Sequence, residues 1–96
     1  MTVKIIGLIK LLDSAAFEEY RRKVGITVAK HGGQVRYRGT LAHTYWNELD
    51  CEAFDAFVEL EFPTLEDSAQ WAASDDYQDL LSVRSAAMKL TLLAIQ

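Results

Sequence analysis

The chain has 96 residues, of which half are apolar and a quarter are charged, a balance that indicates one globular domain and excludes a disordered chain. The net charge of −4 argues against a nucleic-acid partner, because binding to phosphates needs an excess of Lys and Arg. The first apolar run is too short to span a bilayer, and the single cysteine cannot form an internal disulfide, so we expect a cytoplasmic protein with no membrane partner.

A strand over residues 3–12 is the first predicted element, because β-branched and aliphatic residues fill both of its alternating faces. An amphipathic helix follows, and Asp13 or Ser14 can serve as its N-cap. With about 100° of turn per residue, one narrow stripe of this helix contains Phe17, Tyr20, Val24, Val28 and His31. The first four are typical of a buried helix face.

His31 closes this stripe with an imidazole in the last turn of the helix. Gly32 and Gly33 follow it, and we expect both glycines to adopt the positive φ that ends a helix. A histidine with an unperturbed pKa of about 6.5 can move protons at neutral pH. His31 is therefore the candidate catalytic residue.

The middle of the chain is predicted to form two strands joined by an irregular segment. Residues 34–41 and residues 54–62 alternate in hydrophobicity, whereas residues 42–53 show no clear period. Pro63 ends the later strand.

Two arginines are expected to fix the register between these strands. Uninterrupted alternation places Arg36 and Arg38 on one face of the earlier strand. Antiparallel pairing then sets them opposite Glu61 and Glu59, as cross-strand ion pairs.

The last third of the chain is predicted to contain two helical segments and a final strand. Thr64, with Asp67 three residues later, begins the first segment in the manner of a capping box. Ser74 or Asp75 caps the second segment, and Met88–Ile95 forms the last strand. In the second helical segment one stripe contains Tyr77, Leu80, Leu81 and Arg84.

The order of these elements predicts an α+β fold, a ferredoxin-like βαββαβ split sheet with both helices on one face. The other face would expose Ile6, Leu8, Phe57, Leu93 and Ile95. Each such side chain is worth roughly 1.5–3 kcal/mol when it leaves water, and a patch of this size usually marks an interface. We therefore expect a homodimer through the open sheet face.

Motifs for common cofactors and metals are not found in the sequence. The five glycines form neither a dinucleotide-binding nor a phosphate-binding motif. His31, His43 and Cys51 show none of the local spacings of a zinc site. We expect no metal and no tightly bound cofactor.

Two polar residues, His31 and Arg84, interrupt the apolar stripes of their helices. We expect the two helices to run parallel, because each follows one of two parallel strands, and therefore to end at the same end of the sheet. These residues would then converge, with Tyr20, Tyr77 and either Arg38 or Trp71 nearby. One interpretation is structural, since cations suit helix C-termini and aromatic residues fill cores. The other is a small pocket in which His31 moves protons and Arg84 holds a carboxylate or enolate oxygen.

The pieces FEEYRRKVGITVAKHGGQVRYRG (residues 17–39) and ELEFPTLEDSAQWAASDDYQ (residues 59–78), with the region of Arg84 and the apolar last strand, resemble the domain of unknown function 1330 (DUF1330) family. That family belongs to the dimeric α/β-barrel superfamily, so the resemblance implies two ferredoxin-like protomers whose sheets form a barrel. Residues 42–53 depart from the family, because they are longer and more acidic than its usual loop.

The resemblance also implies a set of pattern positions without proving their roles: Tyr20, His31, Gly32, Gly33, Arg38, Trp71, Tyr77 and Arg84. The wider superfamily includes cofactor-free monooxygenases, isomerases and haem-binding enzymes, and the fold does not choose among them.

Two functional hypotheses follow for this single dimeric α/β-barrel domain of residues 1–96. In the first, each protomer binds or converts a small anionic or aromatic molecule in a pocket between helices and sheet. His31 would be catalytic, and the ligand-binding residues would be Tyr20, Arg38, Trp71, Tyr77 and Arg84. The alternative is a non-catalytic dimeric module, structural or regulatory, with a filled core.

Overall fold

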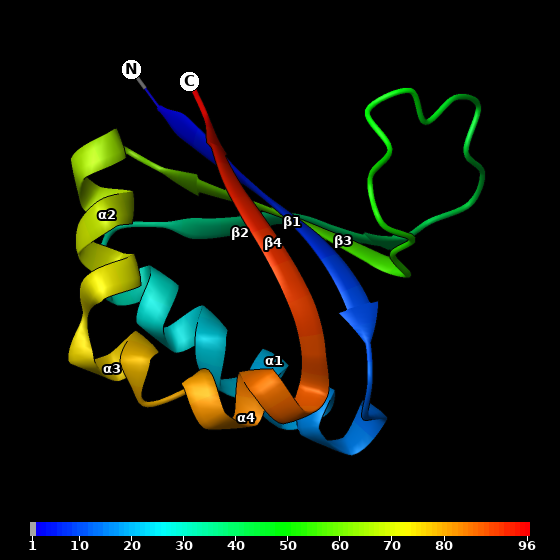
Figure 1. The fold of residues 1–96 in the computed structure, drawn as a ribbon. Helices are drawn as coiled ribbons and strands as arrows, with labels where there is room; N and C mark the ends of the chain where they lie inside the picture. Colours follow the sequence, from blue (N-terminus) through cyan, green and yellow to red (C-terminus); the bar gives the residue numbers. More distant parts are fainter. Residues whose placement is uncertain (1) are drawn as a thin grey trace.

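Strands and helices follow one another in βαββαβ order in the computed structural model, which describes residues 2–96 (Figure 1). The elements are β1 (Val3–Leu11), α1 (Ser14–Lys30), β2 (Gln34–Thr40), β3 (Ala56–Phe62), α2 (Leu65–Ala73), α3 (Asp75–Gln78), α4 (Leu81–Ala87) and β4 (Met88–Ile95). Between β3 and β4 the structure has the three helical segments α2, α3 and α4, where two were predicted. None of the helices within residues 2–96 is long and apolar enough to cross a membrane.

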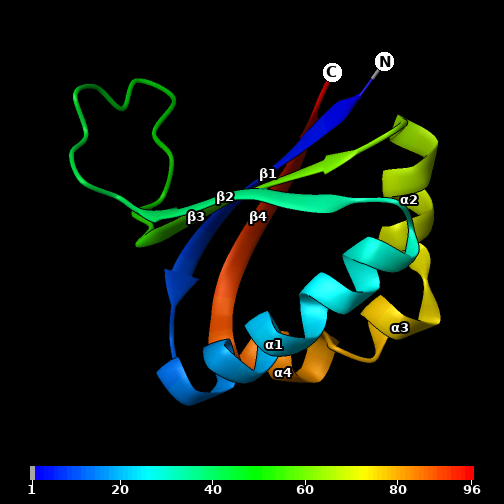
Figure 2. The same ribbon diagram turned by 180° about the vertical axis from the view of Figure 1, so that it is seen from behind.

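The four strands form one sheet in the order β2-β3-β1-β4, and each neighbouring pair is antiparallel. All helical segments lie on the same face of this sheet, as the reverse view shows (Figure 2). This arrangement confirms the predicted ferredoxin-like α+β fold.

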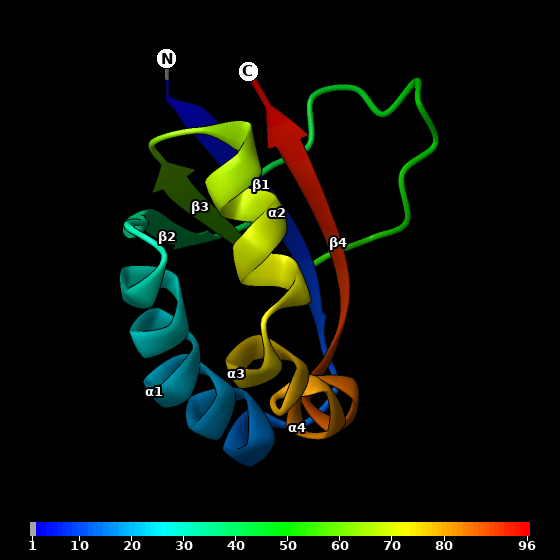
Figure 3. The ribbon, with the colours of Figure 1, turned by 90° about the vertical axis from the view of Figure 1, so that its left-hand side faces the viewer.

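Helices α1 and α2 run in opposite directions along the sheet (Figure 3). The reason is topological: α1 follows β1 and α2 follows β3, and these two strands are antiparallel. The expectation of parallel helices was therefore wrong. Since α1 and α4 end at opposite ends of the sheet, His31 and Arg84 do not converge.

Local capping and core packing hold the helices on the sheet. Thr64 is the N-cap of α2 as predicted, and of the two candidates predicted for each of the other helices Asp13 caps α1 and Ser74 caps α3. The largest fully buried side chains are Trp71, Phe62, Val3 and Val28. The Phe62 and Trp71 ring centroids are 5.4 Å apart, which joins the sheet to α2.

The two glycines after α1 have different roles. Gly32 has a φ of 76° and ends the helix, as predicted. Gly33 does not have positive φ, so that part of the prediction was wrong. Instead, a Cβ built on Gly33 would lie 2.6 Å from a ring carbon of Phe62 and 2.8 Å from Cγ1 of Val28. The residue is a glycine because α1 meets the sheet too closely for a side chain.

A β-bulge in β2 changes the face of the sheet on which its later residues lie. The register of β2 against β3 shifts at Arg36, whose Nε is 3.2 Å from a carboxylate oxygen of Glu61 as expected. Beyond the bulge, Arg38 lies opposite Val58 and not opposite Glu59. The predicted Arg38–Glu59 pair was wrong because one extra residue inverts the alternation. Arg38 therefore lies on the face that the helices cover.

The other face of the sheet carries the apolar residues that the sequence predicts. Ile6, Leu8, Phe57, Leu93 and Ile95 occupy paired positions on it. Leu93 is 47% exposed and Ile95 is 53% exposed. The segment 42–53 is irregular and exposed, as predicted, and projects beyond the sheet (Figure 1).

Candidate ligand-binding site

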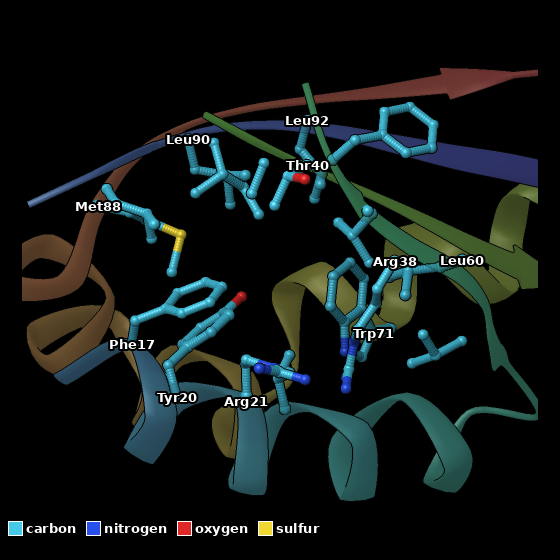
Figure 4. A pocket seen from close by; sticks show the side chains of 18 residues that line it. Phe17, Tyr20, Arg21, Arg38, Thr40, Leu60, Trp71, Met88, Leu90 and Leu92 are labelled. Carbon is cyan, nitrogen blue, oxygen red and sulfur yellow. The ribbon is translucent and has the colours of Figure 1, made fainter. Parts of the chain in front are cut away.

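A cavity of about 270 Å³ lies between α1 and the helix-covered face of the sheet (Figure 4). Most of its lining is apolar, and its polar side chains come from Tyr20, Arg21, Arg38, Thr40 and Trp71. Three of the predicted ligand-binding residues, Tyr20, Arg38 and Trp71, thus line one cavity. Tyr77, Arg84 and His31 are not among its lining residues.

Helical spacing and strand alternation explain how these side chains meet. Phe17, Tyr20 and Val24 follow one another at intervals of three and four residues and therefore share the sheet-facing side of α1. Figure 4 shows Phe17, Tyr20 and Arg21 extending from α1 toward the sheet. Arg38 enters from β2 only because of the bulge at Arg36.

Arg38 places a positive charge at the cavity without a counterion. Its side chain makes no hydrogen bond or ion pair with any residue in the range 2–96. Arg38 is an exposed residue, and the partial burial of its guanidinium lowers its pKa, the nearby charge of Arg21 lowers it further, and Glu18 acts in the opposite direction. Arginine still remains protonated at neutral pH, because its unperturbed pKa is above about 12.

Arg21 lies beside Arg38 but already has an acidic partner. Its Nη1 atom is 3.1 Å from a carboxylate oxygen of Glu18, one turn earlier on α1. Its guanidinium also lies 5.7 Å from the centroid of the Phe17 ring. This side of the cavity therefore has two guanidinium groups and one carboxylate, which within residues 2–96 pairs with Arg21 alone, so the local charge is positive although the whole chain is acidic.

Tyr20 connects the cavity wall to two further residues. Its hydroxyl oxygen is 2.9 Å from the hydroxyl oxygen of Tyr77, which in turn accepts a 2.9 Å hydrogen bond from Nη1 of Arg84. Burial raises the pKa of Tyr20 far above the ordinary value, and the neighbouring Tyr77 raises it further. Tyr20 is therefore a neutral phenol at any pH near neutrality.

His31 lies outside this arrangement. It is the half-buried C-cap of α1, and its backbone N–H donates to the carbonyl oxygen of Val28 at 3.1 Å. Its side chain is close enough to Asp76 to contribute, after Lys30, to the lowered pKa of that carboxyl group. The cavity is thus formed without His31, and a catalytic role for this residue stays a prediction.

Some lining residues were not predicted as site residues. Arg21 follows Tyr20 directly on α1 and lines the cavity from the edge of the sheet-facing stripe, where the helical periodicity does not predict a site residue. Thr40 and Met88 carry no sequence signal for a site, because their places in the lining depend on strand pairing far along the chain.

The indole of Trp71 is held in the cavity wall by a hydrogen bond to α1. Its Nε1 donates to Oγ1 of Thr27 at 2.9 Å, and that hydroxyl donates to the carbonyl oxygen of Val24 at 2.7 Å. Trp71 is 1% exposed and Thr27 is 6% exposed, so water cannot replace either partner.

Thr27→Val should lower the free energy of unfolding by roughly 1–3 kcal/mol, because it leaves the buried indole N–H without an acceptor while keeping the side-chain shape. Thr27→Ser keeps the hydroxyl and serves as the control, with a smaller loss expected. Urea denaturation followed by tryptophan fluorescence measures both. Equal losses for the two variants would show that the hydrogen bond does not matter here.

A four-stranded antiparallel sheet covered on one face, with a cavity under its first helix, defines a ferredoxin-like α/β protomer with a candidate small-molecule site. Residues 2–96 match the family described as "Domain of unknown function (DUF1330)", and the chain belongs to this family. The resemblance found in the sequence is thereby confirmed. No protein with a curated description matches the sequence.

Solved structures share the fold at low sequence identity. The protein of unknown function RPA0582 from Rhodopseudomonas palustris is 19% identical, with 98% of this chain and 80% of that chain covered and a TM-score of 0.81. SnoaB, a cofactor-independent oxygenase from Streptomyces nogalater, is 9% identical, with 99% and 91% covered and a TM-score of 0.72. A dimeric ferredoxin-like protein of unknown function from Jannaschia sp. CCS1 is 9% identical, with 100% and 99% covered and a TM-score of 0.69. At these identities the likeness shows the fold alone.

Proposed function

We propose that the protein binds a small, largely apolar molecule with an anionic oxygen in the cavity between α1 and the sheet. The observation that carries this proposal is Arg38, a guanidinium at the cavity with no acidic partner in residues 2–96 and with Arg21 beside it. Two neighbouring like charges repel each other, so an anion that contacts Arg38 lowers the free energy of the pair.

The size and lining of the cavity indicate the rest of the ligand. A volume of about 270 Å³ lies near the lower end of the range for small-molecule pockets. The walls are formed largely by aromatic and aliphatic side chains, among them Phe17, Val24, Leu60, Leu90 and Leu92. An aromatic or short aliphatic acid satisfies both requirements.

The ionisable side chains that line the cavity are Tyr20, Arg21 and Arg38, one phenol and two guanidinium groups, and none of them is a carboxylate. They are suited to stabilise a carboxylate, enolate or phenolate oxygen by hydrogen bonding and charge. A reaction in this cavity would thus depend on these side chains holding a negatively charged oxygen that belongs to the ligand itself. The fold shared with SnoaB, a cofactor-independent oxygenase, supports a small-molecule role of this kind.

Binding of benzoate tests the proposal, with benzamide as its uncharged counterpart. We expect benzoate, and not benzamide, to raise the melting temperature, because a ligand that binds only the native state stabilises it. Arg38→Gln should weaken benzoate binding roughly 10- to 100-fold by calorimetry, since it removes a charge-assisted contact.

Arg22→Gln is the matched control, because Arg22 is an exposed arginine of α1 without a hydrogen bond or ion pair in residues 2–96. This variant should bind benzoate as the wild type does. Equal binding of benzoate and benzamide, or unchanged binding by Arg38→Gln, would contradict the proposal. If benzoate, phenylacetate and hexanoate all leave the melting temperature unchanged, the non-catalytic module becomes the better hypothesis.

We further propose that two copies associate through the open face of the sheet. The apolar residues of that face are incompletely buried, and Tyr37 beside them is 61% exposed. Several charges on the same face are paired within the chain, with Lys4 3.1 Å from Glu59 and 3.5 Å from Glu61. These pairs can be covered without losing their partners, whereas Lys89, opposite Lys10, forms no ion pair within residues 2–96. Several proteins that share the fold are described as dimeric ferredoxin-like proteins.

A further inference from the structure

Tyr20, Tyr77 and Arg84 form a chain of hydrogen bonds that ends at the cavity. Of these three residues, Tyr20 lines the cavity, whereas Tyr77 and Arg84 stand behind it. Tyr20 is 8% exposed and Tyr77 is 3% exposed. Arg84 forms no ion pair with any residue in the range 2–96, and its one side-chain hydrogen bond there goes to Tyr77.

The number of hydroxyl protons available decides which of the two tyrosines donates in the hydrogen bond between them. Arginine has donors only, so the Tyr77 oxygen accepts from Arg84. The two phenols bring two protons, but the single contact between their oxygens uses one of them. One phenol proton is therefore free, and a free buried proton is costly unless an acceptor reaches it.

Only one of the two possible directions places the free proton where an acceptor can reach it. If Tyr20 donated to Tyr77, the Tyr77 proton would be enclosed behind the cavity with no acceptor among residues 2–96. If Tyr77 donates to Tyr20, the free proton belongs to the phenol that lines the cavity. The second direction is the favourable one, and the positive charge of Arg84 reinforces it by polarising both hydroxyls.

We propose that Tyr20 presents this free phenol proton to the cavity and that the cavity therefore selects anionic ligands with a second, hydrogen-bond-accepting oxygen. Arg84, acting through Tyr77, fixes the direction in which the Tyr20 hydroxyl donates. The ligand class is then a keto or acyl acid of small size. This inference rests on the proposed function, because it assumes an anion held at Arg38. In this arrangement Arg84 is a positioning residue and not a ligand contact.

The burial of Tyr20 is consistent with this role. Burial keeps the pKa of its hydroxyl well above the ordinary value, so the group stays a donor and does not become a phenolate. Figure 4 shows Tyr20 directed into the cavity from α1, while Arg38 approaches from β2. The two residues can thus contact different ends of one ligand.

Two matched ligand pairs test the selectivity: 3-acetylbenzoate with 3-isopropenylbenzoate, and 4-acetylbenzoate with 4-isopropenylbenzoate. The two members of a pair have nearly the same shape, but only the acetyl compound has an acceptor oxygen on its side group. We expect the better acetyl isomer to bind wild type about tenfold more tightly than its isopropenyl counterpart, as one hydrogen bond allows. Tyr20→Phe should abolish this preference, because it removes the only proton that the acetyl oxygen is proposed to accept.

Arg84→Met and Tyr77→Phe should reduce the preference for the acetyl ligand although neither residue contacts it. Arg84→Lys keeps a cationic donor and should restore part of the preference, which a purely structural role for Arg84 would not predict. Arg22→Met, an exposed arginine changed in the same way, is the control and should behave as wild type. A preference that survives in Tyr20→Phe would overturn the inference.

The results separate this inference from the proposed function. Benzoate binding that depends on Arg38, with no preference for the acetyl ligands, overturns the hydrogen-bond chain alone. Absence of binding by benzoate, phenylacetate and hexanoate alike overturns the proposed function. In that case the ligand-free protein, labelled at tyrosine Cζ, still tests the chain: Arg84→Met should shift the Tyr20 resonance and leave those of Tyr37 and Tyr45 in place. An unmoved Tyr20 resonance would show that Arg84 does not act on it.

Discussion

Phe57→Glu should convert the protein from a dimer into a monomer. Phe57 lies on the open face of the sheet, directly opposite Leu8 of β1 and Gly39 of β2. A carboxylate at this position would lose its water in a dimer without gaining a partner, at a cost of several kcal/mol. Sedimentation equilibrium measures the change, and an unaltered circular dichroism spectrum would show that the protomer remains folded.

Ile26→Glu is the matched control for the dimer experiment. Ile26 is 63% exposed on α1, on the opposite side of the protomer from the open sheet face. The variant gains the same charge in place of a similarly apolar residue, and it should remain dimeric. A monomeric wild type at micromolar concentration, or dissociation of both variants alike, would refute the proposed interface.

Gly33→Ala should lower the free energy of unfolding by roughly 1–3 kcal/mol, the usual range for an overpacked core. The new methyl group would approach Phe62 and Val28 to 2.6 and 2.8 Å. Both side chains are less than 2% exposed, so neither can move aside without disturbing the contact between α1 and the sheet. Urea denaturation at one fixed protein concentration measures the loss, because the stability of a dimer depends on concentration.

Gly25→Ala, inside α1, should have the opposite effect on stability. Nothing lies within 4 Å of a Cβ built on Gly25, which is an interior position of α1. Alanine there should raise the free energy of unfolding by roughly 0.5–1 kcal/mol through helix propensity. If the two glycine variants have the same stability, the close approach at Gly33 is not what requires a glycine.

The structure brings only some of the predicted site residues together, and it separates His31 from Arg84. Tyr20, Arg38 and Trp71 do line one cavity, and their roles there remain proposals. His31 and Arg84 were placed together because the helices were taken to be parallel, whereas β1 and β3 are antiparallel and the helices that follow them are too. Arg84 nevertheless reaches the cavity indirectly, through Tyr77.

Arg38 shows why a correct strand prediction does not place every side chain. The sequence indicates the strand but not the bulge at Arg36, because a bulge depends on how two strands pair and not on the alternation within one. That one residue moves Arg38 from the open face to the cavity and separates it from Glu59. The candidate function of the cavity depends on this displacement.

The order of the elements, the helix caps at Asp13 and Thr64 and the apolar open face were determined by the sequence alone. These features follow from residues close together in the chain, through periodicity and local hydrogen bonds. The direction of the helices, the position of Arg38 and the link from Tyr20 to Arg84 were decided only by the tertiary structure. They depend on contacts between strands and helices distant in sequence, and no local pattern records them.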